Sequence, residues 1–292
     1  MTGTPSRDSA AVKQTVDETI TRTVAVARRA SRRRRYRPRR TLLGLAGVIA
    51  LLVVWELAAR TGVVDPRFLP PPSEVLPRLV QLFGIAEFWV AVGDTMVQWA
   101  LGLAIALALA GVLGIIIGLS PFLRRATHST VEFLRPIPSV ALIPLASLLF
   151  GVRIEASLLL IVYAAFWQIF IQVLYGVADV DQIAMSTGRS YGFSRWQRIR
   201  HIVLPTTLPY LMTGVRLAAA VALILAITAQ LIIGTRGLGR EITLAQNAGL
   251  YTTMYALILA TGFLGVLINF GARLLERRML SWHHSVREEV PA

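Results

Sequence analysis

The residues of this chain that could perform covalent chemistry are few and stand far apart. The 292 residues include no cysteine, and the only lysine is Lys13. These two facts exclude thiol nucleophiles, thiolate metal sites and a P-loop, which needs a Gly-Lys-Ser/Thr sequence to hold phosphates. The four histidines (His128, His201, His283 and His284) show no spacing typical of a metal site or a catalytic triad. We therefore expect no catalytic residue, no bound metal, no cofactor and no enzymatic activity in this chain.

The composition indicates that most of the chain lies in lipid. Apolar residues make up 55% and charged residues 16%, whereas soluble domains are roughly one-quarter charged. A helix that crosses a bilayer needs about 20 apolar residues. Six apolar runs approach or exceed that length: 42–59, 99–119, 137–150, 156–177, 210–233 and 254–275. We expect an all-α membrane protein with about six transmembrane helices at 41–281, between a basic, disordered tail at 1–40 and a short tail at 282–292.

The distribution of basic residues predicts the orientation of these helices. Most of the 30 lysines and arginines precede the first apolar run, follow the second or the fourth run, or lie at the C-terminal end. The positive-inside rule therefore places both termini in the cytosol. The arginine-rich stretch at 32–40 directly precedes a membrane helix, so we interpret it as an anchor to anionic lipid headgroups and not as a nucleic-acid site.

The third apolar run differs from the others. It is short, it is entered through Pro136 and Pro138, and it contains Pro144. Proline removes a backbone hydrogen bond and clashes with the preceding turn, so a regular helix is not expected here. Broken backbone at membrane depth is tolerated where protein buries it or water reaches it, and this segment is a candidate cavity wall.

Three glutamines interrupt otherwise apolar runs or their entrances. Gln98, Gln168 and Gln230 are the candidates for the solute pathway, with Gln230 the first to test. Polar side chains in membrane helices face the interior of the bundle, where they either bridge two helices or line a path. Both alternatives remain open for each glutamine.

A connection at about 182–205 is much longer than a membrane hairpin needs. Gly192 permits a sharp break, and Ser194 with Gln197 has the spacing of a capping box that begins a new helix. The predicted unit is a short helix, a break and a second helix that present aromatic and basic groups. On pattern alone, an amphipathic helix lying on the membrane is the alternative.

Gly192, followed by nine residues and then Ile202-x-Leu204-Pro205, resembles the EAA loop of ABC importer permeases. Further matches are Trp55-Glu56, Phe68-Leu-Pro-Pro-Pro-Ser-Glu74, Leu134-Arg-Pro-Ile-Pro138, Phe150-Gly151, Leu208-Pro209, Gly214-Val-Arg216 and Gly237-Leu-Gly239. This combination is similar to the nitrate, sulfonate and taurine branch of that family. The resemblance implies a type I ABC importer permease fold, multi-pass in a bacterial cytoplasmic (inner) membrane.

The resemblance also implies partners and a site. The chain would form half of a pore with a second copy, and two ATPase subunits would hold ATP and Mg. An extracytoplasmic binding protein would deliver an oxyanion such as an alkanesulfonate, taurine or nitrate. The residues implied in coupling to the ATPase are Ser186, Thr187, Gly188, Arg189, Tyr191, Gly192, Phe193, Ser194, Trp196, Ile202, Leu204 and Pro205. Two alternatives remain: an ion-coupled secondary transporter, and a membrane-anchored adaptor without transport.

Overall fold

The computed structural model describes residues 37–62, 64–65 and 67–280, and every regular element in these ranges is helical. The chain divides into two units, Met1–Pro66 and Arg67–Ala292. In the first unit, α2 (Arg37–Arg60) contains the predicted first crossing, since Leu42–Arg60 is long and apolar enough to span a membrane. The predicted tails lie outside the described residues, except for 37–40, which begin α2.

The second unit holds the remaining elements. They are α3 (Pro72–Leu82), α4 (Ala86–Leu119), α5 (Pro121–Leu134), a 3₁₀ turn (Ser139–Leu142), α6 (Ile143–Phe150), α7 (Ile154–Ala178), α8 (Gln182–Ser190), α9 (Arg195–Arg198), a π-turn (Ile199–Val203), α10 (Leu204–Ile233), α11 (Leu238–Asn247) and α12 (Tyr251–Met279). Among the described residues, 5 helical segments are long and apolar enough to cross a membrane, or 6 if the bent pair α5 and α6 forms one crossing. This agrees with the expected all-α class.

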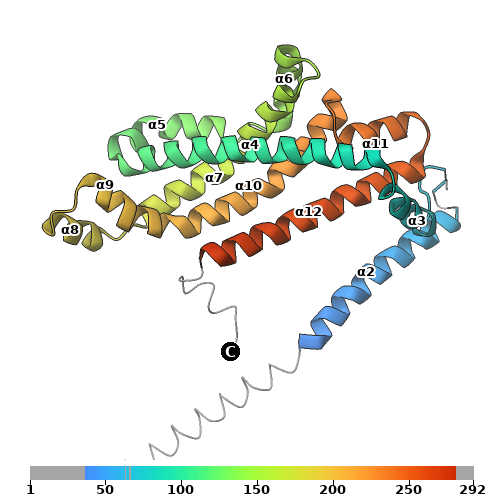
Figure 1. Cartoon of the computed structure of the whole chain (residues 1–292), viewed down its shortest axis with the longest axis horizontal. Helices are drawn as coiled ribbons and strands as arrows, with labels where there is room; N and C mark the ends of the chain where they lie inside the picture. The colour runs from blue at the N-terminus through green and yellow to red at the C-terminus, as the bar shows by residue number, and fades with distance from the viewer. Residues whose placement is uncertain (1–36, 63, 66, 281–292) are drawn as a thin grey trace, which may run out of the picture. The chain divides into compact units, whose positions relative to one another are not determined.

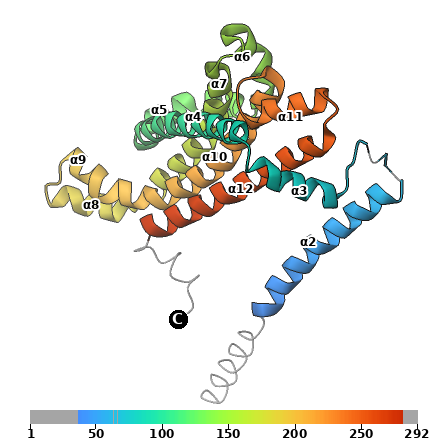
Figure 2. The same ribbon diagram turned by 45° about the vertical axis from the view of Figure 1, so that its right-hand side comes forward.

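The core of the second unit forms where α7 packs against both α4 and α10 (Figures 1 and 2). Small residues on α4 allow this close approach. A Cβ atom at Gly114 would lie 2.7 Å from Cγ1 of Val173, and one at Gly118 would lie 2.9 Å from Cβ of Val177. Because lipid is as apolar as the side chains, such tight packing is a main source of helix association in membranes.

The third crossing is broken, as the prolines predicted. Pro121–Leu134 and Ser139–Phe150 meet at an angle of 80°, and Pro136 and Pro138 lie in the connection. Pro144 stands in the first turn of α6, where its missing N–H costs little, so it begins a helix and does not interrupt one. The sequence did not predict α5, because its arginines made residues 121–134 look like a polar connection.

Two other boundaries differ from the prediction, and two short helices were not predicted. α4 begins at Ala86, well before the expected start of the second crossing. α10 begins at Leu204, before the expected start of the fifth run at residue 210, because the π-turn leads directly into it and Pro205 stands in its first turn. The short amphipathic helices α3 and α11 were not predicted, since each is too short to give a clear periodic signal.

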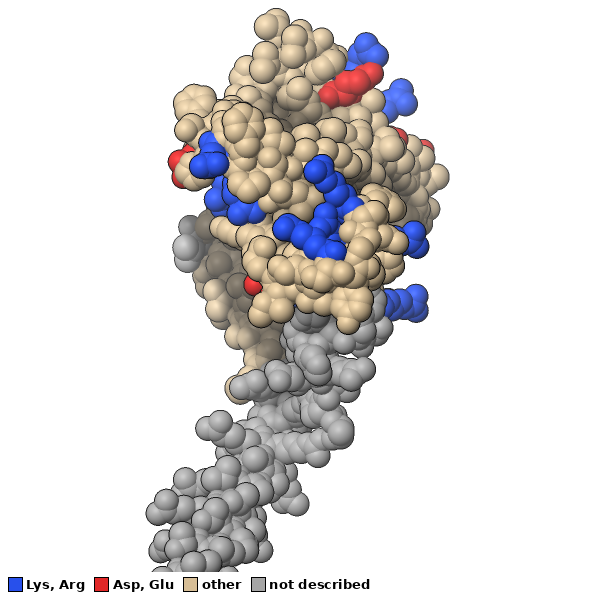
Figure 3. Space-filling view, turned by 90° about the vertical axis from the view of Figure 1, so that its left-hand side faces the viewer, with Lys and Arg blue, Asp and Glu red and all other residues tan. Residues whose placement is uncertain are grey.

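The ends of the bundle in the second unit differ in charge. α8 and α9 lie at one end together with the last turn of α12, and α3 and α11 lie at the opposite end (Figures 1 and 2). Figure 3 looks onto the end with α8 and α9, where arginine side chains gather and few acidic ones are visible. The positive-inside rule predicts that this end faces the cytosol.

Candidate functional site

The first candidate site is the segment 182–203, here called the α8–α9 element. Asp181 caps α8 by accepting a hydrogen bond of 2.7 Å from the N–H of Ile183. The chain then turns at Gly192, whose φ of +75° lies in the left-handed region that glycine adopts without strain. The predicted capping box is present: the N–H of Gln197 donates to Oγ of Ser194 (3.2 Å), and Oε1 of Gln197 accepts from the N–H of Ser194 (2.7 Å).

Helix α8 rests on the beginning of the fifth crossing through a close contact at Gly188. This glycine is buried, and a Cβ atom there would lie 3.1 Å from Cδ1 of Ile202 and 3.5 Å from Cγ of Arg198. The neighbouring residues Ser186 and Thr187 are exposed. Gly188 is therefore the residue of this turn that brings α8 close to the π-turn.

The outer surface of the α8–α9 element is apolar and basic at once. The side chains of Ile183, Tyr191 and Trp196 are 75%, 79% and 64% exposed. The exposed arginines Arg189 and Arg195 lie among them. Tyrosine, tryptophan and arginine are the residues that contribute most to protein–protein binding energy, so this surface has the composition of a docking site.

The remaining predicted residues of this site continue from that surface to the start of α10. Phe193 is partly exposed, and its ring centroid lies 6.2 Å from that of His201. Ile202 is half-buried in the π-turn, and Leu204 and Pro205 begin α10 on its exposed side. The predicted residues thus form one continuous element.

Two contacts beside this element were not predicted from the sequence. The hydroxyl of Tyr210 donates to Oδ2 of Asp179 across 2.9 Å and joins the start of α10 to the end of α7. One turn away from Asp179, a Cβ atom at Gly176 would lie 2.9 Å from Cγ2 of Thr207. The α8–α9 element is therefore attached to the core through two closely packed helices.

The second candidate site lies at the opposite end, where two of the three predicted glutamines meet. Nε2 of Gln230 donates to Oε1 of Gln98 (3.3 Å), and Oε1 of Gln230 accepts from Thr95 Oγ1 (3.1 Å) and from the N–H of Gly239 (3.0 Å). Nε2 of Gln98 donates to the carbonyl of Arg236 (2.6 Å). Gln230 is fully buried. Within the subunit the two glutamines bridge helices, which is one of the two roles that the sequence left open, since they join α4, α10 and the turn before α11.

Gln168 does not belong to this cluster. At the same end of the bundle, Ser157 of α7 shares a hydrogen bond of 2.8 Å with Thr235. Gln168 lies three turns further along α7, about 16 Å away at 1.5 Å per residue, and is half-buried.

Among the prolines predicted to form a cavity wall, Pro136 lines a cavity beside α5.

An ion pair between α10 and α12 was also not predicted. Nη1 of Arg216 lies 3.0 Å from Oε2 of Glu276, whose side chain is 18% exposed. The signal in the sequence was a single arginine within apolar α10 and a glutamate among the arginines at the end of α12. Charged groups in such helices tend to pair with one another.

A helical bundle with a broken crossing and an exposed helix pair at its basic end has the architecture of a transporter's membrane subunit. Residues 110–281 match the family described as "Binding-protein-dependent transport system inner membrane component". The taurine transport system permease protein of Escherichia coli is 32% identical over 268 residues, covering 88% of this chain and 96% of that protein. The chain therefore belongs to this family of permeases.

Two further comparisons agree with this family assignment. The bicarbonate transport system permease protein of Synechococcus elongatus is 27% identical over 252 residues, covering 82% of this chain and 89% of that protein. A structure of the MetNI methionine ABC transporter in an inward-facing conformation matches with a TM-score of 0.57 at 18% identity, covering 65% of this chain and 95% of that chain. This likeness confirms the type I importer permease fold.

Family membership decides between the alternatives that the sequence left open. The chain is a multi-pass inner-membrane permease subunit of an ATP-driven, binding-protein-dependent ABC importer, and it has no ATPase activity itself. A separate ATPase and a substrate-binding protein are therefore its partners. Among the described residues, no group of three or more His, Cys, Asp or Glu side chains could hold a metal ion.

Proposed function

We propose that the α8–α9 element is the docking site for the ATPase and that the chain forms half of the pore for a small oxyanion of the sulfonate class. The observation that carries the docking proposal is the exposed surface of Ile183, Tyr191 and Trp196 at the basic end of the bundle. In water such a surface is costly, and contiguous exposed apolar groups mark interaction sites.

The contacts of this element also supply a route for coupling. A force applied to α8 passes through the contact between Gly188 and Ile202 into the π-turn, and then into the start of α10. The hydrogen bond from Tyr210 to Asp179 joins the first part of α10 to the end of α7. Closure of the ATPase on α8 would then move α7 and α10 together, and these two helices contribute much of the core.

Replacement of residues 186–202 by a flexible linker tests the docking proposal. The ATPase should co-purify with the wild-type chain and fail to co-purify with the replaced chain. A variant with Gln246→Ala, at the opposite end of the bundle, serves as a control and should retain the ATPase. Equal recovery of the ATPase with the replaced chain would refute the proposal.

The substrate class rests on the relatives, one named for taurine and one for bicarbonate. Both solutes carry an oxyanion group, and the taurine relative is similar over 88% of this chain. Calorimetry on the partner binding protein should show its tightest binding for taurine or another alkanesulfonate, with nitrate and bicarbonate weaker. Tightest binding of a solute without an oxyanion would contradict this assignment.

We further propose that the pore is a homodimer. Only one EAA-type loop occurs in this sequence, so two chains are needed to engage two ATPase subunits. The mass of the purified complex should correspond to two copies of this chain and two ATPase subunits. A complex with one copy and a different permease would show a heterodimeric pore instead.

A further inference from the structure

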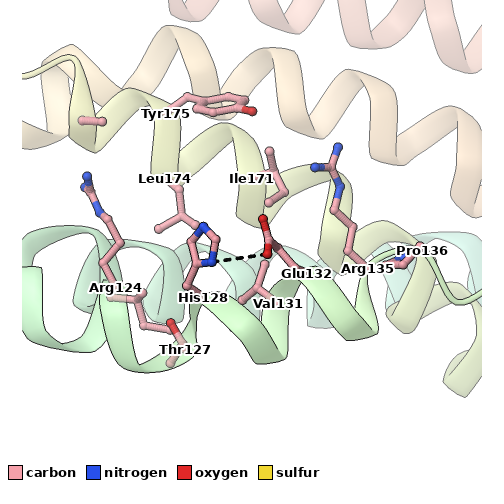
Figure 4. A pocket seen from close by; sticks show the side chains of 12 residues that line it. Arg124, Thr127, His128, Val131, Glu132, Arg135, Pro136, Ile171, Leu174 and Tyr175 are labelled. Atoms are coloured by element: carbon pink, nitrogen blue, oxygen red, sulfur yellow. Dashed lines mark ion pairs between the residues drawn. The ribbon is translucent and has the colours of Figure 1, made fainter.

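A cavity of about 660 Å³ opens beside α5, where this helix faces the ends of α4 and α7 (Figure 4). One part of its wall is apolar and is formed by Ile117, Val131, Ile171 and Leu174. Another part is formed by charged side chains of α5. The cavity therefore offers an apolar surface and a polar one to the same occupant.

The polar side of the cavity is a row of four residues, namely Arg124, His128 and Glu132 on α5 and Arg135 at its C-terminal cap. Figure 4 shows the histidine and the glutamate between the two arginines, all on the side of α5 that faces α7. Nδ1 of His128 lies 3.4 Å from Oε2 of Glu132. Neither Arg124 nor Arg135 forms an ion pair with this carboxylate.

Neither arginine of the row forms an ion pair among the described residues. Arg124 donates through Nη2 to the carbonyl of Gly118 across 2.9 Å, and a carbonyl does not cancel the charge of a guanidinium group. In the part of the chain that the structure describes, the side chain of Arg135 makes no ion pair. Guanidinium groups bind phosphate, sulfonate and carboxylate oxygens through paired N–H groups, so the row favours an anion with such a head.

The dimensions of the cavity indicate an elongated ligand. Arg124 and Arg135 are about 16 Å apart along the helix axis at 1.5 Å per residue. Cavities of about 300–1,000 Å³ hold ligands the size of a drug molecule. A two-carbon sulfonate would reach one arginine and leave the apolar wall uncovered.

We propose that this cavity binds an amphiphilic anion, with its oxyanion head at one end of the row, at Arg124 or Arg135, and its apolar tail against Ile171 and Leu174. Two sources could supply this chemistry: an anionic phospholipid of the surrounding leaflet, or a free alkanesulfonate on the cytosolic side. Basic pockets between membrane helices on that side commonly bind lipid headgroups. Such a ligand would occupy the space beside α5, a helix without buried residues of its own.

The test uses the permease–ATPase complex and native mass spectrometry with phosphatidylglycerol and phosphatidylcholine as probes. The wild type should retain phosphatidylglycerol preferentially. The double variant Arg124→Gln/Arg135→Gln should bind it about 30-fold more weakly, since one arginine near a membrane surface contributes about fivefold. Arg125→Gln is the matched control, because Arg125 is exposed on the same helix and does not line the cavity.

A third variant should change the affinity for phosphatidylglycerol in the opposite direction. Glu132→Gln removes the negative charge from the row and should tighten binding of phosphatidylglycerol, whereas a merely structural defect would not. Addition of hexanesulfonate distinguishes the two sources: displacement of the lipid shows that a free sulfonate uses the same head site, and persistence of the lipid assigns the site to phospholipid.

Three results would overturn the proposal. The first is equal retention of phosphatidylglycerol by the wild type and the double variant. The second is an equal loss in Arg125→Gln, which would indicate general surface charge. The third is an absence of binding for both phosphatidylglycerol and hexanesulfonate in the wild type, which would show that the cavity holds neither source of the anion.

Discussion

Gln230 provides a sharp test of the packing at the end of the bundle that holds α11. In the substitution Gln230→Met the side chain keeps a similar length but loses its amide. The N–H of Gly239 then loses its acceptor at 3.0 Å, and Oε1 of Gln98 loses its donor at 3.3 Å. A buried polar group left unpaired costs about 1–3 kcal/mol, so the two together destabilise the attachment of α11 by about 2–6 kcal/mol.

Hydrogen exchange of the backbone amides of α11 measures this effect. A loss of about 2 kcal/mol corresponds to exchange roughly 30-fold faster when opening is local, so the α11 amides should exchange at least that much faster in the variant. Gln246→Met on the exposed surface of α11 is the control and should leave the exchange unchanged. Unchanged exchange in Gln230→Met would refute the bridging role of the glutamine.

Three further substitutions test the packing, the cap and the ion pair. Gly176→Leu should lower the free energy of unfolding by about 1–3 kcal/mol, because a Cβ atom there would lie 2.9 Å from Thr207. Gly111→Leu is the control and should leave the stability unchanged, because a Cβ atom there would meet nothing within 4 Å. Equal melting temperatures of the two variants would contradict this reasoning. Ser194→Ala should weaken the start of α9 by about 1 kcal/mol, which should appear as faster amide exchange at 195–198. Ser194→Asp should keep the cap, and equal exchange in the two variants would contradict the capping role of Ser194. Arg216→Gln should destabilise the chain by leaving the carboxylate of Glu276 unpaired. When Glu276→Gln is added to this variant, thermal unfolding should show a recovery of about 0.5–3 kcal/mol. Additive losses in the double variant would show that the two side chains do not interact.

The sequence predicted the features that depend on local chemistry. Long apolar runs identified the crossings, because lipid requires every backbone group to be paired within a helix. The capping box at Ser194 and the break at Gly192 were predicted because the residue types satisfy backbone groups only a few positions away. Pro136 and Pro138 predicted the break in the third crossing because proline lacks a backbone N–H, whereas Pro144 begins α6.

The features that depend on distant partners could not be predicted in this way. Gln98 and Gln230 are 132 residues apart, and nothing in either run indicates that the two amides meet. Helix α5 was read as a connection, since its polar side faces a cavity and its arginines resemble those of a loop. The π-turn at Ile199–Val203 was not predicted, because its residues follow no pattern that differs from an α-helical turn.

The absence of cysteine from the whole sequence allows a direct test of the central claim that the α8–α9 element binds the ATPase. A single cysteine introduced by Ser186→Cys on the exposed side of α8 can carry a benzophenone maleimide, and Gln246→Cys on α11 serves as the matched position at the other end. On irradiation of the assembled importer, the label at residue 186 should form an adduct with the ATPase and the label at residue 246 should not. An α8 label that yields no ATPase adduct, or equal adducts from both positions, would contradict the account.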